Sequence, residues 1–158
     1  MFIRIKKIKN KEYAYLVENK WLNNSSRQVV KDYLGRVCKP ERAKSVIKIN
    51  HGLDFKEFIL DLARQELLNY GFIAEGGVLK SGNVTVDLNE LKFTKNKKAI
   101  AISLNEGFLC AHTLSQLLNF RPKGNEEEVG MTLAIMLVEA GIKVPKEEFI
   151  HVFEKVFK

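Results

Sequence analysis

The sequence predicts an α+β fold, in which a small basic antiparallel β-meander precedes a mixed body of one helix, β-hairpins and C-terminal helices. Two observations predict the architecture. Apolar and charged side chains alternate with the period of a strand over the first 40 residues, and apolar residues recur at helical spacing over 54–70 and 145–157. A third observation separates the two parts by charge. Residues 1–48 carry 13 Lys and Arg against four Asp and Glu, a net charge of +9, whereas residues 49–158 carry a net charge of −2.

The meander is predicted from three strands in the N-terminal third of the chain. We expect strands at 2–9, 12–18 and 27–34, with a polar loop at 23–26 between the last two. Gly35 should bend the third strand. A meander of this size is marginal in water alone, so it needs a surface to pack on.

A basic connector follows the meander and marks the expected domain boundary. Residues 39–44 are rich in Lys and Arg and are broken by Pro40. We expect a β-meander module at 1–39 and an α+β body at 49–158, and the two could also pack as one domain. The alternative is that Pro40 opens a short helix at 40–48.

The body opens with the helix that the sequence specifies most strongly. Asp54 and Glu57 form a capping box in front of the periodic apolar residues of 54–70, and Gly71 is a suitable stop. Strands with a turn at 81–83 should fill 78–104. The segment 99–104, AIAISL, should be a strand that is buried on both faces.

Helices should form the remainder of the chain. We expect one at 107–119, a second that Asn125 caps and Gly141 ends, and a third that starts at Pro145. The middle helix is apolar nearly all round, which predicts deep burial or a partner surface, such as a homodimer contact.

The composition is that of a globular protein, with 46% hydrophobic and 28% charged residues. No apolar run approaches the roughly 20 residues that span a bilayer, and the first residues lack the apolar core of a secretory signal. Cys38 and Cys110 lie far apart without a CxxC motif. That pattern predicts reduced thiols in a cytoplasmic protein, with a disulfide as the alternative.

The basic third of the chain combines positive charge with aromatic residues, and this predicts nucleic-acid binding. Cations neutralise phosphates, and flat rings can stack on unpaired bases. Trp21 lies beside the polar loop and is the best candidate for stacking. The candidate binding residues are Arg4, Lys6, Lys7, Lys9, Lys11, Lys20, Trp21, Arg27, Lys31, Arg36, Lys39, Arg42 and Lys44.

Two alternatives remain open for this region. The cations could be no more than the solvated face of a small sheet. Tyr13, Tyr15 and Tyr33 alternate as core residues do, which favours packing over stacking for these three rings.

A local resemblance accompanies the basic pattern. Residues 13–37 contain YAYLVE, a polar loop and RQVVKDYLGRV. This segment resembles the N-terminal β-rich region of prokaryotic insertion-sequence transposases, in which an aromatic strand ending in Val-Glu precedes a strand ending in Tyr-Leu-Gly-Arg. The resemblance covers 25 of 158 residues and implies a DNA-binding accessory region. Those transposases continue into a long catalytic core with spaced acidic residues, which this chain has no room for, so transposition is not implied.

No catalytic, metal or nucleotide motif is evident, and the sequence predicts no cofactor. The three histidines are scattered, and only Cys110 and His112 are close in sequence, at a spacing that separates them on a helix. The acidic run 126–128 suits a helix start. The glycines lack the spacing of a phosphate-binding loop.

The sequence therefore favours a non-enzymatic nucleic-acid-binding protein without membrane association. RNA is favoured over DNA, in or beside a ribonucleoprotein such as the ribosome. One alternative is a DNA-binding accessory or regulatory protein related to a mobile element. Another is an adaptor that binds a protein partner through its apolar C-terminal helices.

Overall fold

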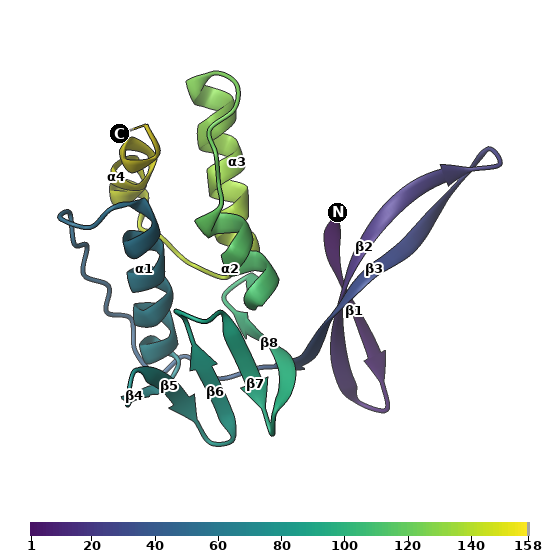
Figure 1. Cartoon of the computed structure of the whole chain (residues 1–158), viewed down its shortest axis with the longest axis horizontal. Helices are drawn as coiled ribbons and strands as arrows, with labels where there is room; N and C mark the ends of the chain where they lie inside the picture. Colours follow the sequence, from purple (N-terminus) through teal and green to yellow (C-terminus); the bar gives the residue numbers. More distant parts are fainter. Residues whose placement is uncertain (158) are drawn as a thin grey trace.

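The computed structural model describes residues 1–157 as one continuous sheet with helices packed on its body and a two-stranded arm at one end (Figure 1). The strands are β1 (Phe2–Ile8), β2 (Lys11–Leu22), β3 (Ser25–Cys38), β4 (Ile73–Glu75), β5 (Val78–Ser81), β6 (Val84–Asp87), β7 (Lys92–Lys95), β8 (Lys98–Leu104) and β9 (Gly107–Leu109). The helices are α1 (Phe55–Asn69), α2 (Ala111–Leu118), α3 (Glu126–Glu139) and α4 (Lys146–Val156). The α+β fold with an N-terminal meander is confirmed.

The strand order of the sheet is β1-β2-β3-β8-β7-β6-β5-β4, and β9 pairs with β8 outside this path. Neighbouring strands run antiparallel except β3 and β8, which are parallel over three residue pairs. The meander is thus joined to the body by hydrogen bonds as well as by the connector. β8 is the central strand, and Ile100, Ala101 and Ile102 are buried, as the apolar run predicts.

Two-residue turns shape the meander. Lys9 and Asn10 have φ values of 50° and 65°, and Asn23 and Asn24 have 49° and 62°. Positive φ at both central residues belongs to the type I′ hairpin, whose twist matches that of the strands. The expected loop at 23–26 is therefore wrong: only two residues turn, and the strands on either side are longer. Trp21 lies inside β2.

Gly35 permits the contact between meander and body. Its φ is 123°, and a Cβ at this position would lie 2.4 Å from the backbone oxygen of Ala99 on β8. Only glycine accepts both the positive φ and this close approach of the two backbones. The bend predicted at Gly35 is thus the point where β3 meets β8.

The connector after β3 is extended and lies along α1. The backbone N–H groups of Ala43 and Lys44 donate to the Asn69 carbonyl at 2.8 and 3.1 Å. The Gln65 side chain accepts from the Lys48 N–H at 2.6 Å and donates to the Lys48 carbonyl at 2.8 Å. Side chains of α1 thus bond the connector backbone, so the alternative of a helix at 40–48 is wrong.

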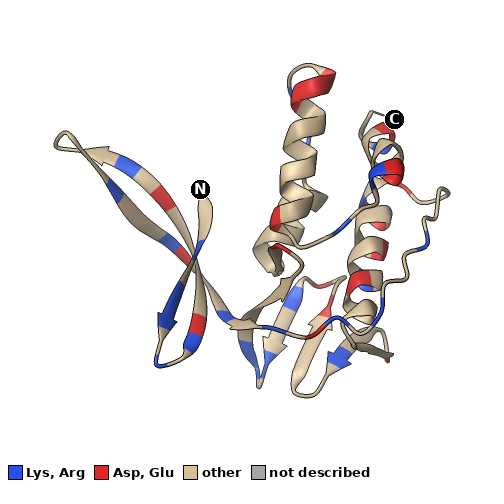
Figure 2. Cartoon of the chain, turned by 180° about the vertical axis from the view of Figure 1, so that it is seen from behind, with Lys and Arg blue, Asp and Glu red and all other residues tan. Residues whose placement is uncertain are grey.

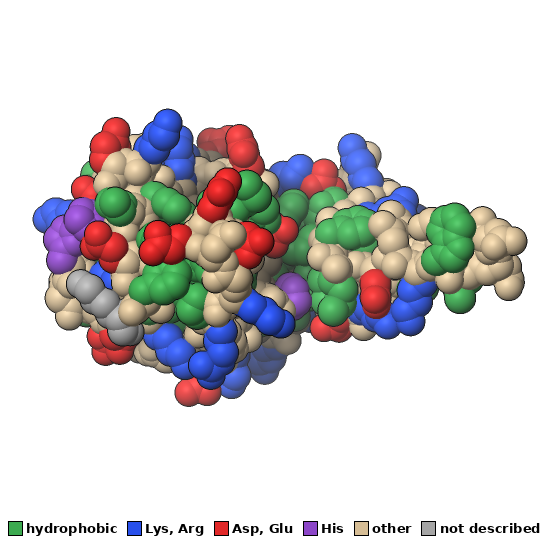
Figure 3. Space-filling model, turned by 90° about the horizontal axis from the view of Figure 1, so that it is seen from above, with side chains coloured by type: hydrophobic (Ala, Val, Ile, Leu, Met, Phe, Trp, Pro, Cys, Tyr) green, Lys and Arg blue, Asp and Glu red, His purple; other side chains and the backbone are tan. Residues whose placement is uncertain are grey.

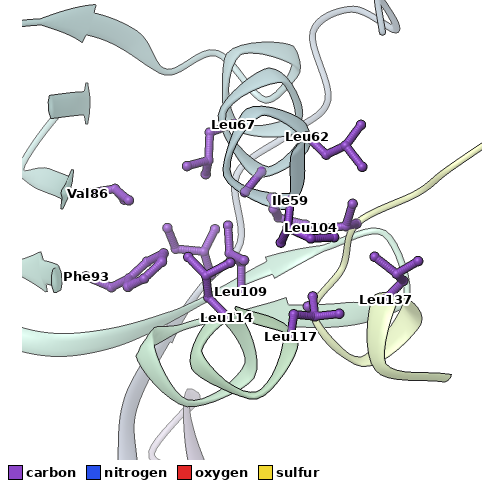
Figure 4. Close-up of a cluster of buried hydrophobic side chains, with 14 of the residues drawn as sticks. Ile59, Leu62, Leu67, Val86, Phe93, Leu104, Leu109, Leu114, Leu117 and Leu137 are labelled. Carbon is purple, nitrogen blue, oxygen red and sulfur yellow. The ribbon is translucent and has the colours of Figure 1, made fainter. Parts of the chain in front are cut away.

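The main core lies between the sheet and the helices, and most of its labelled side chains are leucines from several elements (Figure 4). Ile59, Leu62 and Leu67 come from α1; Leu67 points to the side of Val86 and Phe93 of the sheet, whereas Leu62 points to the opposite side of the helix. Burying a side chain of this size contributes about 2 kcal/mol. Leu114 and Leu117 of α2 and Leu137 of α3 extend the same cluster.

The capping predictions for the long helices are confirmed. Asp54 accepts from the Glu57 N–H at 2.8 Å, and the Glu57 carboxylate accepts from the Asp54 N–H. Asn125 and Glu128 make the same reciprocal pair before α3. Such caps stabilise a helix by about 1 kcal/mol each. Within residues 1–157, no helix is both long and apolar enough to cross a membrane.

The predicted helix at 107–119 is wrong in its first part. Residues 107–109 form the short strand β9, and the helix begins only at Ala111. A Cβ on Gly107 would lie 2.0 Å from the Val138 carbonyl oxygen of α3. Gly107 therefore serves a close approach between strand and helix, which the local pattern does not reveal.

Candidate nucleic-acid interface

One face of the meander packs against the body. Ala14, Leu16 and Leu34 are buried there, and Ile3 and Ile5 are partly buried beside them. Their partners in the body are Ala101 of β8, Phe108 of β9 and Cys110. This apolar contact fixes which face of the meander remains open.

The opposite face carries tyrosines and cations. The β1–β2 register pairs Arg4 with Tyr15 and Lys6 with Tyr13. The β2–β3 register then pairs Tyr15 with Tyr33 and Tyr13 with Arg36. Directly paired residues share a face of a sheet. We call this surface the tyrosine face, composed of Arg4, Lys6, Tyr13, Tyr15, Tyr33 and Arg36.

The rings of the tyrosine face form one cluster. The Tyr15 and Tyr33 centroids are 5.1 Å apart, and those of Tyr13 and Tyr33 are 6.5 Å apart. The Lys6 ammonium lies 4.9 Å from the Tyr15 centroid, a cation–π contact. Tyr33 is 49% exposed, and the tyrosines stand outside the buried cluster of the meander. The interpretation as a core residue is therefore wrong for Tyr33, whereas Tyr13 and Tyr15 are half-buried outside that cluster.

Partial burial also acts on the ionisation of Tyr33. Desolvation raises the pKa of the Tyr33 hydroxyl above its ordinary value, and the electrostatic effect of the neighbouring Tyr15 adds a smaller increase. The ring is thus neutral at physiological pH, and its hydroxyl can donate a hydrogen bond.

Two register shifts twist the meander. They fall between Ala14 and Tyr15 and between Leu16 and Val17 of β2. Bulges of this kind increase the right-handed twist of a strand pair. Beyond Val17, β1 ends and only β2 and β3 continue, as the projecting ribbon of Figure 1.

The far end of this ribbon, here called the arm tip, spans residues 18–29. Lys20 pairs directly with Arg27, and Trp21 pairs with Ser26. Trp21 is 72% exposed, which agrees with the expectation of a ring free to stack. The charge view shows Lys and Arg, with some Asp and Glu between them, along the strands of the ribbon, whereas the turn at its far end carries no charge (Figure 2).

Most of the other candidate cations are exposed. Lys7, Lys9 and Lys11 surround the β1–β2 turn. Lys31 forms an ion pair with Glu18 at 3.2 Å, and Lys39 forms one with Glu12 at 2.8 Å. The hydrogen bond from Lys31 lowers the pKa of the Glu18 carboxyl below its ordinary value. Exposed pairs of this kind are weak, so a phosphate can compete for the lysines.

Arg42 differs from the other candidates because it binds within the fold. Its guanidinium lies 3.3 Å from the carboxylate of Glu66, a side chain that is fully buried in α1. It also donates to Asn105 at 3.1 Å and lies over the Tyr70 ring at 5.4 Å. Burial alone would lower the pKa of Arg42. The hydrogen bonds and charges of Glu66 and Tyr70 outweigh that effect, so the pKa of Arg42 lies above its ordinary value. We therefore leave Arg42 outside the interface. Lys44 is exposed on the connector.

The tyrosine face is the feature that sequence reasoning missed. Alternation along one strand shows that Tyr13 and Tyr15 share a face, but it does not show which face is buried. That choice depends on the body, which covers the Ala14 and Leu16 side. The one local signal is the small side chain of Ala14 between Tyr13 and Tyr15, since a small residue allows the body to approach the meander closely on that side.

Comparison with known proteins adds no relative. Neither a family model, nor a curated protein, nor a solved structure matches this chain.

Proposed function

We propose that the chain is an RNA-binding protein that holds unpaired nucleotides on the tyrosine face, as a component or companion of a ribonucleoprotein. The observation that supports it is the cross-strand grouping of three tyrosines with Arg4, Lys6 and Arg36 on the open face of the meander. Two free thiols support a cytoplasmic location.

The chemistry of the face suits single-stranded or looped RNA. Unpaired bases can stack on aromatic rings that a sheet displays, while neighbouring cations bind the phosphates. The ring centroids lie 5.1 to 6.5 Å apart on one surface, so more than one base can stack on the tyrosines. Because these groups lie on paired strands, their positions are fixed before binding.

The first experiment titrates the protein with single-stranded RNA, an RNA hairpin and duplex DNA at two salt concentrations. If about six phosphates are contacted, the log–log salt slope should be about −4 for single strands. The double change Arg4→Glu and Lys6→Glu should flatten that slope by at least about 1.4. Tyr33→Ala should weaken RNA binding about 5- to 160-fold, the loss expected for one stacked base.

Matched controls separate this site from general electrostatics. Lys123→Glu with Lys146→Glu changes the net charge from +7 to +3, as the Arg4 and Lys6 pair does, but on the body. Phe157→Ala removes an exposed ring at the other end of the molecule. Neither control should weaken RNA binding as strongly as the variants of the tyrosine face. Weak, salt-insensitive binding to all three nucleic acids would overturn the proposal.

A second candidate function, binding to duplex DNA, is favoured by the shape of the arm tip. A two-stranded β-ribbon fits the major groove of B-DNA, and the arm tip is such a ribbon with Lys20 and Arg27 near its end. This is the surface that the resemblance to transposase N-terminal regions would use. A double change of Lys20→Glu and Arg27→Glu should then abolish duplex binding, whereas Tyr33→Ala should leave duplex binding intact.

A protein-adaptor role is favoured by the outer side of α3. Leu133 and Leu137 are buried, but Met131, Ile135 and Val138 are exposed and lie four and three residues apart. That spacing forms an apolar stripe along one side of the helix. Sedimentation analysis of the protein with and without Ile135→Glu tests whether this stripe supports a homodimer.

A further inference from the structure

The two histidines that lie farthest apart in the sequence meet at the start of α1. His51 lies in the loop that leads to α1, and His151 lies on α4. Their ring centroids are 4.6 Å apart, with the ring planes inclined at 71°. Glu148 lies one turn before His151 on α4, and its Oε2 is 3.7 Å from His151 Nε2. Figure 3 shows histidine side chains at the surface at the end of the molecule opposite the arm.

These three side chains each offer one donor atom, and the three atoms lie within 4.8 Å of one another. Three donors of a tetrahedral zinc ion lie about 3.3 Å apart, as metal–ligand distances of 2.0 to 2.2 Å require. His51 is exposed and His151 is half-buried, so changes of side-chain rotamer are the movements that would close that difference.

The Glu148 carboxylate provides an independent observation. Its Oε2 atom is buried, and it has no hydrogen-bond partner among the residues that the structure describes. The Glu148 side chain is 33% exposed as a whole, but a buried carboxylate oxygen without a hydrogen-bond partner is unfavourable, and a metal ion is one partner that would satisfy it. The 3.7 Å contact with His151 is too long for a hydrogen bond.

The loop that carries His51 is held in place by α4. Lys155 donates from its ammonium to the backbone carbonyls of His51 and Leu53. The Asn50 side chain accepts from the Gly52 N–H at 3.1 Å and supports the turn. The position of His51 relative to α4 is therefore fixed by contacts that do not involve the imidazole, as a preformed site requires.

We propose that His51, Glu148 and His151 bind a divalent transition-metal ion of the zinc class. Two imidazoles and one carboxylate are the ligand types that Zn²⁺ accepts, and three protein ligands leave one position for water or another ligand. The ion would tie the loop before α1 to α4 and so couple the C-terminal helix to the body.

The test uses the full chain without a histidine tag, freed of metal with a chelator. Titration with Zn²⁺ by calorimetry should show one ion per chain, and the melting temperature should rise with added zinc. His51→Ala, Glu148→Gln and His151→Ala should each weaken binding by about tenfold or more. The metal-free variants should keep the metal-free melting temperature of the original protein, which separates lost binding from lost folding.

His112→Ala is the matched control, because it removes the third histidine without touching the cluster. It should leave the zinc affinity unchanged. Substitution with Co²⁺ gives a second readout: a spectrum without thiolate charge transfer is expected from nitrogen and oxygen ligands. An unchanged zinc affinity in His151→Ala, or a cobalt spectrum with thiolate bands from Cys38 or Cys110, would overturn the proposal.

Discussion

Lys20 of β2 and Arg27 of β3 face each other directly across the hairpin of the arm. Two like charges in this register disfavour the pairing of the strands, whereas opposite charges favour it by roughly 0.2–1 kcal/mol. The arm tip therefore keeps a locally unfavourable pair, and a polyanion between the two side chains would remove the repulsion.

This relationship gives the first prediction. Lys20→Glu should slow amide hydrogen exchange at the arm tip, because the pair with Arg27 becomes attractive. The same change should weaken nucleic-acid binding. Lys123→Glu carries the same charge change on the body and should leave the exchange at the tip as it was. Equal exchange and equal affinity in both variants would contradict a binding role for the pair.

The second prediction concerns Arg42 and Glu66. The buried Glu66 carboxylate accepts from Asn105 at 2.6 Å and from Asn69 at 3.1 Å, and Arg42 supplies its countercharge. Removing one partner of a buried ion pair leaves an uncompensated charge, so Arg42→Met should lower the free energy of unfolding by about 3 kcal/mol. Urea denaturation measures this loss.

A double variant tests the cause of that loss. Arg42→Met combined with Glu66→Gln removes both charges and should be more stable than the sum of the single losses implies. Additive losses would show that packing, and not the charge pair, determines the effect. RNA binding measured under native conditions should change little in Arg42→Met, because Arg42 lies outside the tyrosine face.

The third prediction tests the joint between meander and body. Gly35→Ala should destabilise the protein by more than about 2 kcal/mol, because the new Cβ meets the Ala99 carbonyl and the positive φ is strained. Gly82→Ala is the control. Gly82 also has a positive φ, of 58°, but open space surrounds it, so only the strain of about 1 kcal/mol remains. Thermal melts measure both losses. Equal losses of stability in Gly35→Ala and Gly82→Ala would contradict the close approach of β3 and β8 at Gly35.

The fourth prediction uses the two free thiols as reporters. Cys110 lies between meander and body and should react with a disulfide reagent only when the meander detaches. Cys38 is half-buried, and burial raises its thiol pKa above the ordinary value. Its reaction should therefore be slow at neutral pH and accelerate as the pH rises through that raised pKa, since the thiolate is the nucleophile.

Single variants assign the two rates. Cys38→Ser leaves only Cys110, and Cys110→Ser leaves only Cys38. In a Gly35→Ala background, Cys110 should react faster than in the original chain. A Cys110 rate that matches that of Cys38 in the original protein would contradict a packed meander.

Local signals predicted those parts of the fold that local interactions determine. The capping pairs of Asp54 and Asn125 and the stop at Gly71 depend on neighbours in sequence, and the structure has them as expected. The strand at 99–104 was predicted from its apolar run, although its burial depends on distant partners. The predicted start of α2 is wrong because Gly107 lies against the backbone of α3 at Val138, more than 30 residues away in the sequence.

The candidate sites were harder to predict for the same reason. The sequence composition shows that the N-terminal third is rich in Lys and Arg. It does not show that Arg42 differs from the other cations, because its partner Glu66 is 24 residues away. The tyrosine face depends on which side the body covers. His51 and His151 are 100 residues apart and become neighbours only when α4 packs on the loop before α1, so no linear spacing could reveal them.

The parallel pairing of β3 with β8 has a consequence for how the chain is assembled. β3 ends at Cys38, and its partner residues in β8 are 100–102, so more than 60 residues separate the two sides of the joint. Contacts of such long sequence separation form late in folding. During synthesis the meander emerges first, and residues 36–38 of β3 lack their β8 partner until that strand appears. Arg36 lies in this segment, and a charged side chain on an unpaired strand edge disfavours its pairing with another chain.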